Sequence, residues 1–352
     1  MDRLNIGGGD RVGMRITLNE KRSASPGKTS SEILQRADTS KILHEYNFLY
    51  LENNSKMEIT KELLSNWEQG GKEIGRGAFG SVFVAPFNKD RAFAIKKIDK
   101  IHSEEKFLQE MTTMFQCRAC PDVVYYYGTA YTEINVFFVM ELLVTNVRTI
   151  IKNHTGLKIN EMLLAAVAIP ITDALFFLSE ELRKIHKDVK PENLLVGRDG
   201  AVKLADFGMT GEKKQDASSA ATQGGGTTFY FPPEYYKNDF KTRNSAADVW
   251  ALGLTLYEMV TGKFPYTLEG TQQMLTDAIL NNDAPVLCKK NLSAFSLSLC
   301  TYVNCCLVKD HQHRWKARDL KNNNFYKENH EKKKEYKEAM EEALKKLSLI
   351  EN

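Results

Sequence analysis

The chain has 352 residues, of which 42% are hydrophobic and 26% charged, and this suits a soluble globular protein with one large or two ordinary domains. A net charge of +3 is too small for a nucleic-acid-binding surface, so no nucleic-acid partner is expected. The first ten residues are polar rather than a charged start before an apolar stretch, so no secretory signal is expected. The expected location is the cytoplasm, with the nucleus left open.

Residues 1–66 are rich in Gly, Ser, Asn and charged residues and show no sustained periodicity. We expect most of this segment to be a disordered extension of the folded domain.

From about residue 67, apolar runs rich in Val and Phe alternate with turns. "SVFVAPF", the turn "NKD" and "RAFAIKKI" together predict a β-hairpin. Ser103 is a suitable N-cap for a helix, and "INVFFVMELLV" then returns to strand. The apolar positions of that helix recur at helical spacing: Phe107, Leu108, Met111, Met114 and Phe115. A small antiparallel sheet with one helix is therefore expected up to about residue 143.

Helical patterns dominate residues 144–326, with a long run that ends at Gly262. The most membrane-like run, residues 162–178, contains Pro170 and Asp173 and is shorter than the roughly 20 apolar residues of a membrane span. We interpret it as a buried helix, interrupted at Pro170 unless it kinks or restarts, and we expect no membrane partner.

Residues 327–352 predict a charged helix with a single apolar stripe. The stripe consists of Tyr336, Met340, Leu344, Leu347 and Ile350. Packing on the helical region is the favoured interpretation, and binding of a partner protein is the alternative.

"IGRGAFGSV" contains Gly75, Gly77 and Gly80 in a GxGxxG pattern, flanked by Ile74 and Val82. Glycines let the backbone approach a polyphosphate closely and supply amide donors. Dinucleotide-binding folds share this spacing, but there the glycines open a helix, whereas here they lead into a strand. A dinucleotide fold is therefore disfavoured.

Lys96 follows on the next predicted strand, where its ammonium could reach phosphates beneath the glycine-rich loop. Strand alternation alone does not distinguish this role from that of an ordinary edge lysine such as Lys97. Glu110 falls toward the apolar side of the predicted helix, where a carboxylate needs a cation, and Lys96 is its natural partner.

"IHKDVKPENLLVG" supplies Asp188, Lys190 and Asn193, and "LADFGM" supplies Asp206. The three side chains Asp188, Asn193 and Asp206 together provide the oxygens that Mg²⁺ and a hydroxyl nucleophile require. With all these elements in order, residues 67–326 resemble the eukaryotic protein kinase family.

The resemblance implies an α+β bilobal fold, with a small antiparallel-sheet N-lobe over about 67–143 and a larger, mainly helical C-lobe over about 144–326. It implies ATP and Mg²⁺ as cofactors. Asp188 is then the base that accepts the substrate hydroxyl proton, and Lys190 stabilises the transferring phosphate.

By the same resemblance, Asn193 and Asp206 are Mg²⁺ ligands, and Lys96 and Glu110 form the ion pair of the active state. The resemblance places Met140 at the gatekeeper position and Glu141 to Leu143 in the hinge that hydrogen-bonds adenine.

Further implied features are structural. The resemblance makes Arg314 the buried partner of Glu234 and Asp248 the aspartate that opens a buried helix. Lys187 stands where the family usually has arginine, and lysine lacks the planar fork that binds a phosphorylated segment in two places. Control by phosphorylation is therefore expected to be weaker.

"SSAATQGGGTTFYFPPE", with Ser218 and Thr222, resembles the activation segment of MAP kinase kinases, as does "SAADVWALGLTLYEMVTGKFPY". This subfamily implies phosphorylation of a Thr and a Tyr in a MAP kinase, and an upstream kinase that acts near Ser218 and Thr222. Glu192 counts slightly against this assignment, since serine is commoner there. The alternative is a Ser-rich loop without a regulated phosphorylation site.

Two further hypotheses about the function of the whole chain remain. One is a Ser/Thr kinase of a neighbouring subfamily, and the other is a pseudokinase scaffold, although every catalytic group is present. Arg11 and Arg15 ahead of Ile16 and Leu18 match a MAP kinase docking peptide, a weakly specific pattern.

Overall fold

The computed structural model describes residues 48–352, except 52–55, 78–79, 88–90, 100–103, 133–134, 213–226, 238–243, 267–270, 288–294 and 352. The expected disorder and docking peptide in residues 1–47, the Ser103 cap, and the sites Ser218 and Thr222 all lie outside these residues.

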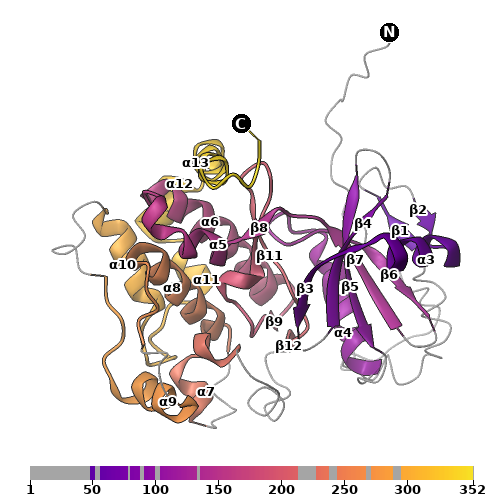
Figure 1. Cartoon of the computed structure of the whole chain (residues 1–352). Coiled ribbons are helices and arrows are strands. Elements are labelled where there is room, and N and C mark those ends of the chain that lie inside the picture. Colours follow the sequence, from indigo (N-terminus) through magenta and orange to yellow (C-terminus); the bar gives the residue numbers. More distant parts are fainter. Residues whose placement is uncertain are drawn as a thin grey trace. The chain divides into compact units, whose positions relative to one another are not determined.

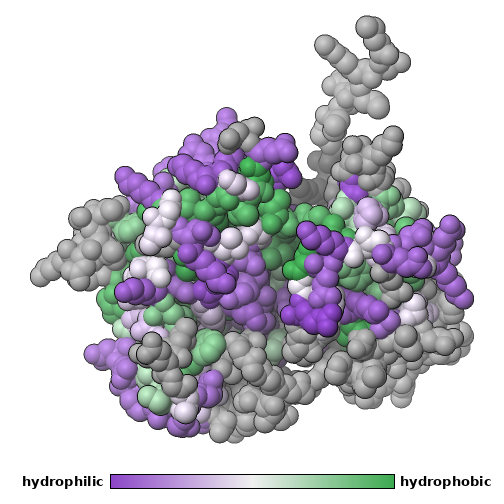
Figure 2. All heavy atoms as spheres, in the orientation of Figure 1, coloured by the Kyte–Doolittle hydropathy of each residue, from purple (hydrophilic) through white to green (hydrophobic). Residues whose placement is uncertain are grey.

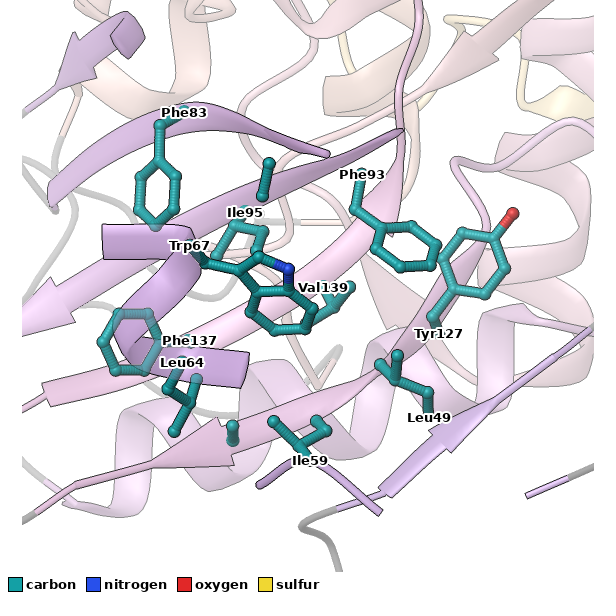
Figure 3. Close-up of a cluster of buried hydrophobic side chains, with 12 residues drawn as sticks. Leu49, Ile59, Leu64, Trp67, Phe83, Phe93, Ile95, Tyr127, Phe137 and Val139 are labelled. Carbon is teal, nitrogen blue, oxygen red and sulfur yellow. The ribbon is translucent and has the colours of Figure 1, made fainter. Parts of the chain in front are cut away.

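Ordered structure begins before the boundary expected at residue 67. Strands β1 (Phe48–Tyr50) and β2 (Lys56–Glu58) pair antiparallel, and helix α3 (Lys61–Gly70) follows, capped by the Thr60 side chain. Leu49 and Trp67 belong to one buried cluster with aromatic side chains of the large sheet (Figure 3). Strands this short carry no detectable periodicity in sequence, so only their burial in the folded chain reveals them.

A five-stranded antiparallel sheet forms the small lobe, in the order β3-β4-β5-β7-β6 (Figure 1). Its strands are β3 (Lys72–Gly77), β4 (Gly80–Pro86), β5 (Ala92–Asp99), β6 (Tyr126–Tyr131) and β7 (Asn135–Glu141). The predicted hairpin is confirmed, because β4 and β5 pair with Val82 opposite Lys96. Helix α4 (Glu104–Cys117) lies beside the sheet and buries the apolar residues that predicted it, apart from the half-buried Phe115.

The larger lobe is mainly helical, with short strands near its junction with the sheet (Figure 1). Its strands are β8 (Thr145–Asn146), β9 (Lys184–Ile185), β10 (Leu194–Val196), β11 (Val202–Leu204) and β12 (Gly211–Glu212). Its helices are α5 (Val147–Lys152), α6 (Glu161–Phe176), α7 (Pro233–Tyr236), α8 (Ala246–Thr261), α9 (Gln272–Asn281), α10 (Leu297–Cys306), α11 (Ala317–Leu320), α12 (Asn324–Asn329) and α13 (Lys333–Lys346). The short 3₁₀ helices are η1 (His154–Gly156), η3 (Pro191–Asn193) and η4 (Thr227–Tyr230), and η2 (Phe177–Glu181) is a π-helix that continues α6.

Helix α6 is the buried core helix of this lobe. Together with η2 it forms a stretch of 21 residues that is long and apolar enough to cross a membrane, but 78% of its apolar window is buried inside the protein. The expected interruption at Pro170 is wrong, because α6 continues through that residue. An interior proline costs about 3 kcal/mol, and here the surrounding packing outweighs it, since Leu163 to Thr172 are all buried.

One helix end and one helix packing follow their sequence signals. Gly262 ends α8 in the left-handed conformation, with φ 69°, and its amide donates to the Glu258 carbonyl. The apolar stripe of α13 packs against α6, which confirms the favoured interpretation. The C-terminal part of the stripe, Leu347 and Ile350, lies beyond the end of the helix.

Candidate active site

One buried lysine holds two carboxylates together at the junction of the lobes. The Nζ of Lys96 on β5 lies 2.7 Å from Oε1 of Glu110 on α4 and 2.8 Å from Oδ1 of Asp206. The ion pair expected between Lys96 and Glu110 is thus present, and the lysine also reaches the aspartate that follows β11. The sheet, α4 and the segment after β11 are therefore joined by a single ammonium group.

Burial and the neighbouring opposite charges shift the pKa values of these three groups in opposite directions. Burial disfavours the charge on Lys96, but the two carboxylates outweigh it and raise the pKa of Lys96 above its usual value. Burial raises the pKa of Glu110. Burial alone would raise the pKa of Asp206, but Lys96, with smaller contributions from His186 and Lys190, outweighs it and lowers the pKa of Asp206 to about 2. Asp206 is therefore ionised at neutral pH, and 36% of its side-chain surface is exposed.

Asp188 lies in a second cluster of buried polar groups. Lys190 Nζ is 3.0 and 2.9 Å from its two carboxylate oxygens. The Nδ2 of Asn193, in η3, donates to the Asp188 carbonyl and to its Oδ2, both at 2.8 Å. Side chains within five residues of one another in the sequence thus fix the direction of the carboxylate before any substrate binds.

The backbone of the segment that carries Asp188 is hydrogen-bonded to the side chain of Asp248, the third residue of α8. The backbone amides of His186 and Lys187 each donate to one oxygen of this buried carboxylate at 2.8 Å. Lys187 has a left-handed backbone, with φ 71°, a conformation that costs a non-glycine residue free energy. The two hydrogen bonds to Asp248 offset this cost.

Burial shifts the pKa values of Asp188 and His186 in this segment. Burial raises the pKa of Asp188 to about 6, although Lys190 opposes the shift. Burial lowers the pKa of His186 to about 4, so the imidazole is neutral. Its Nε2 lies 3.1 Å from the Ala205 carbonyl and donates to it, while Nδ1 accepts from the Asp188 amide at 3.3 Å.

The glycine-rich loop joins β3 and β4, with Gly77 opposite Gly80. A Cβ at Gly80 would lie 1.8 Å from the Lys97 carbonyl oxygen, and its φ is 135°, so only glycine fits. A Cβ at Gly75 would meet no protein atom within 4 Å, so this glycine borders open space. Ile74, at the start of the loop, is 52% exposed.

The other residues expected to bind adenine lie on the same sheet or directly after it. Val82 lies opposite Lys96, Met140 lies opposite Ala94, and Leu143 follows the end of β7. Among the described residues, none accepts a hydrogen bond from the Leu143 amide. Hydrophobic residues gather on the surface where the sheet meets the helical lobe (Figure 2). These residues could provide the apolar walls and the backbone donor of an adenine site.

The hinge is braced on its other side by charged contacts. The Glu141 carboxylate accepts hydrogen bonds from the Tyr125 amide, at 2.5 Å, and from Lys203 Nζ on β11, at 2.6 Å. Its amide donates to the Tyr125 carbonyl. Only the backbone carbonyl of Glu141 is therefore suited to face a nucleotide.

The donor set fits a magnesium ion. Asp206 offers a partly exposed carboxylate, and Asn193 uses its amide nitrogen on Asp188, which leaves its carbonyl oxygen to a ligand. Two hard oxygen donors with room for water and phosphate are typical of protein-bound Mg²⁺. Among the described residues, no group of three or more His, Cys, Asp or Glu side chains forms a separate metal cluster.

Outside this site, a bidentate ion pair holds helix α7, which follows η4. Arg314 donates to Glu234 at 2.8 and 2.9 Å. Its other three N–H groups donate to the carbonyls of Val308, Ala246 and Lys309. The partnership expected between Glu234 and Arg314 is present.

Sequence reasoning missed three basic residues near the site: Lys203, Lys184 and Arg148. Lys184 on β9 reaches the side chains of Thr113 and Gln116 on α4, at 2.6 and 3.1 Å. Each partner lies tens of residues away along the chain, so no local spacing predicts these contacts.

Comparison with known proteins agrees with this geometry. The family model described as a protein kinase domain matches residues 69–326. The chain is 34% identical over 263 residues to MAP kinase kinase mkk-4 of Caenorhabditis elegans, covering 72% of each chain. It is 33% identical over 263 residues to dual specificity mitogen-activated protein kinase kinase 7 of Homo sapiens, covering 72% of this chain and 61% of the human protein. It is 30% identical over 256 residues to dual specificity mitogen-activated protein kinase kinase sek-1 of C. elegans, covering 71% of this chain and 75% of that protein.

Proposed function

Since the chain belongs to the protein kinase family, whose members transfer phosphate with ATP and a divalent metal ion, we propose that it is a MAP kinase kinase. It phosphorylates a Thr and a Tyr in the activation loop of a MAP kinase. The observation that carries the proposal is the assembled pair of charged clusters, Lys96–Glu110–Asp206 and Asp188–Lys190–Asn193, in a chain similar to dual specificity relatives.

Asp188 accepts the proton of the substrate hydroxyl. With a pKa of about 6 it is ionised at neutral pH, yet basic enough to attract a proton as the hydroxyl oxygen attacks. Lys190, 2.9 Å from this carboxylate, is close enough to offset negative charge on the transferring group. Positioning and charge compensation supply most of the rate increase in phosphoryl transfer.

Lys96 binds ATP phosphates beneath the glycine-rich loop, and Glu110 orients its ammonium group. Asn193 and Asp206 hold Mg²⁺, which neutralises charge on the phosphates when bound. Backbone groups of Glu141 and Leu143 bind the adenine edge.

An upstream kinase switches this activity by phosphorylating Ser218 and Thr222. The nearby run Gly224 to Gly226 makes the segment entropically costly to order, so added charge with a cationic partner has a large effect on its conformation. Lys187 offers a single ammonium rather than a guanidinium fork, which makes this control weaker than with arginine. The basic-apolar segment at Arg11 to Leu18 docks the MAP kinase, and the protein acts in the cytoplasm.

Glu192 favours a second candidate, a Ser/Thr kinase of a neighbouring subfamily with other substrates. Phosphosite mapping by mass spectrometry separates the two. The chain is incubated with Mg-ATP and a set of catalytically dead MAP kinases, beside Asp188→Asn and a Ser218→Asp/Thr222→Asp variant.

Phosphate on both Thr and Tyr of one loop, lost in Asp188→Asn and enhanced in the acidic variant, supports a MAP kinase kinase and its switch. Transfer only to unrelated serines or threonines supports the second candidate. ATP binding without transfer contradicts both.

A further inference from the structure

Arg148 of α5 joins three elements around the reacting centre. Its Nε donates to Glu192 Oε1 of η3 at 2.7 Å, and its Nη1 donates to Glu258 Oε1 of α8 at 2.5 Å. Its Nη2 donates to the hydroxyl of Tyr230, at the end of η4. That hydroxyl donates in turn to the second Glu258 oxygen at 2.6 Å.

These contacts describe a site shaped for a guanidinium group. Two carboxylates from different elements face one planar cation, an arrangement that arginine fills better than lysine because its donors point in several fixed directions. The Tyr230 hydroxyl remains protonated, since burial and then Glu258 raise its pKa above the usual value. One positive and two negative charges leave the site with a net charge of −1.

The site opens to solvent at Glu192 and borders the reacting carboxylate. Glu192 lies four positions after Asp188, and 44% of its side chain is exposed, against 19% for Arg148 and 8% for Glu258. Tyr230 also lines the pocket that contains Asp188, Phe231 and Pro232. A protein segment that presents a hydroxyl to Asp188 therefore passes close to Glu192 and Tyr230.

We propose that Arg148 is a specificity-determining residue, because it fills from within an acidic site that would otherwise bind an arginine of the protein substrate. Its own guanidinium satisfies both carboxylates, so an incoming arginine finds little unpaired charge. The substrates of this enzyme are therefore protein segments without a required arginine beside the phosphorylated residue. This deepens the proposed function, but its test does not depend on catalysis.

Binding of a short fluorescent peptide tests the proposal directly. The peptide carries arginines on the N-terminal side of a serine, and a matched peptide carries neutral citrullines instead. Arg148→Met exposes Glu192 and Glu258, so we expect it to bind the arginine peptide about tenfold more tightly than the wild type does, as charged hydrogen bonds allow. The citrulline peptide should bind both proteins equally.

The variant Arg148→Met/Glu192→Gln is the control for the acidic site, and the tenfold gain should largely disappear in it. A purely structural role for Arg148 would change the binding of both peptides together. Equal binding of the arginine peptide to wild type and Arg148→Met, or a gain that survives Glu192→Gln, would overturn the proposal.

Arg148→Lys covers the case in which Arg148→Met does not fold, as judged by its thermal unfolding. A lysine ammonium contacts the two carboxylates less completely, so we expect a gain of about threefold for the arginine peptide alone. No gain in Arg148→Lys would then count against the proposal. The experiment measures only peptide binding. Its result therefore still tests the role of Arg148 if the MAP kinase kinase assignment fails.

Discussion

Two buried ion-pair clusters differ in how completely their charges are satisfied. Arg314 is fully buried, uses all five N–H donors and balances one carboxylate, Glu234. Lys96 serves two carboxylates, and one of them, Asp206, is partly exposed and has a left-handed backbone, with φ 64°. The Arg314–Glu234 pair has no donor left for a ligand, so its role is structural. The Lys96–Glu110–Asp206 cluster keeps negative charge on Asp206 available for a bound cation.

The largest effect is expected at Asp188. Asp188→Asn removes the proposed proton acceptor but keeps the shape of the side chain, so kcat should fall by roughly 10²–10⁴-fold. Thermal unfolding should shift by only a few degrees, because the lysine that loses its counter-charge, Lys190, is partly exposed to solvent. Steady-state transfer assays beside a melting curve check both, and a kcat within threefold of wild type would remove Asp188 from the mechanism.

The Arg314–Glu234 pair should show the opposite pattern, a large effect on stability and a small effect on rate. Arg314→Met leaves the Glu234 carboxylate buried without its cation, which should lower the free energy of unfolding by about 3–5 kcal/mol. Urea denaturation measures this, and the double variant Arg314→Met/Glu234→Gln should recover part of the loss. A loss below about 1 kcal/mol would show that the pair contributes little to stability.

Lys96→Met should affect activity strongly and stability less than Arg314→Met does, because Asp206 is partly exposed and Glu110, whose pKa burial raises, can take up a proton. The variant leaves Glu110 and Asp206 facing each other and removes a cation from the phosphate site, so kcat/KM for ATP should fall by about 10²-fold. A titration of rate against ATP concentration checks this. If instead the main effect were a stability loss as large as that of Arg314→Met, the contrast between the two clusters would fail.

The pH dependence reports the balance of burial and charge at Asp188. Because this carboxylate must be ionised to accept a proton, kcat/KM should decline below its pKa of about 6. Lys190 lowers the pKa of Asp188, so Lys190→Met should raise that pKa and move the decline to higher pH. A pH profile of both proteins checks the direction, and an acidic shift would contradict the account.

The smallest expected effect concerns the helix that carries Asp248. Gly262 ends α8 at φ 69°, and Gly262→Ala places a Cβ in the left-handed region at a cost of about 1–2 kcal/mol. Urea denaturation should show this loss while the rate per folded molecule stays unchanged. A large loss of rate would show that this helix end is coupled to the site.

Local signals predicted a large share of this molecule. The hairpin of β4 and β5, the end of α8 at Gly262 and the pairing of Lys96 with Glu110 all follow from short-range patterns or a motif. Each depends on residues whose types match the local structure, so propensity and final fold agree.

Tertiary packing decided the features that the sequence did not predict. Strand β1 is too short to show periodicity, yet Leu49 is fully buried. Pro170 remains inside α6 because its neighbours are buried on all sides. The Arg148 site joins residues up to 110 positions apart, for which no local spacing exists.

The most direct test of the central contrast is the rate of phosphate transfer per folded molecule, measured at low temperature for Lys96→Met and Arg314→Met in parallel. We expect Arg314→Met to remain within about threefold of the wild-type rate, and Lys96→Met to lose about 10²-fold. Equal loss in both variants, or the larger loss in Arg314→Met, would contradict the assignment of catalysis to one cluster and stability to the other.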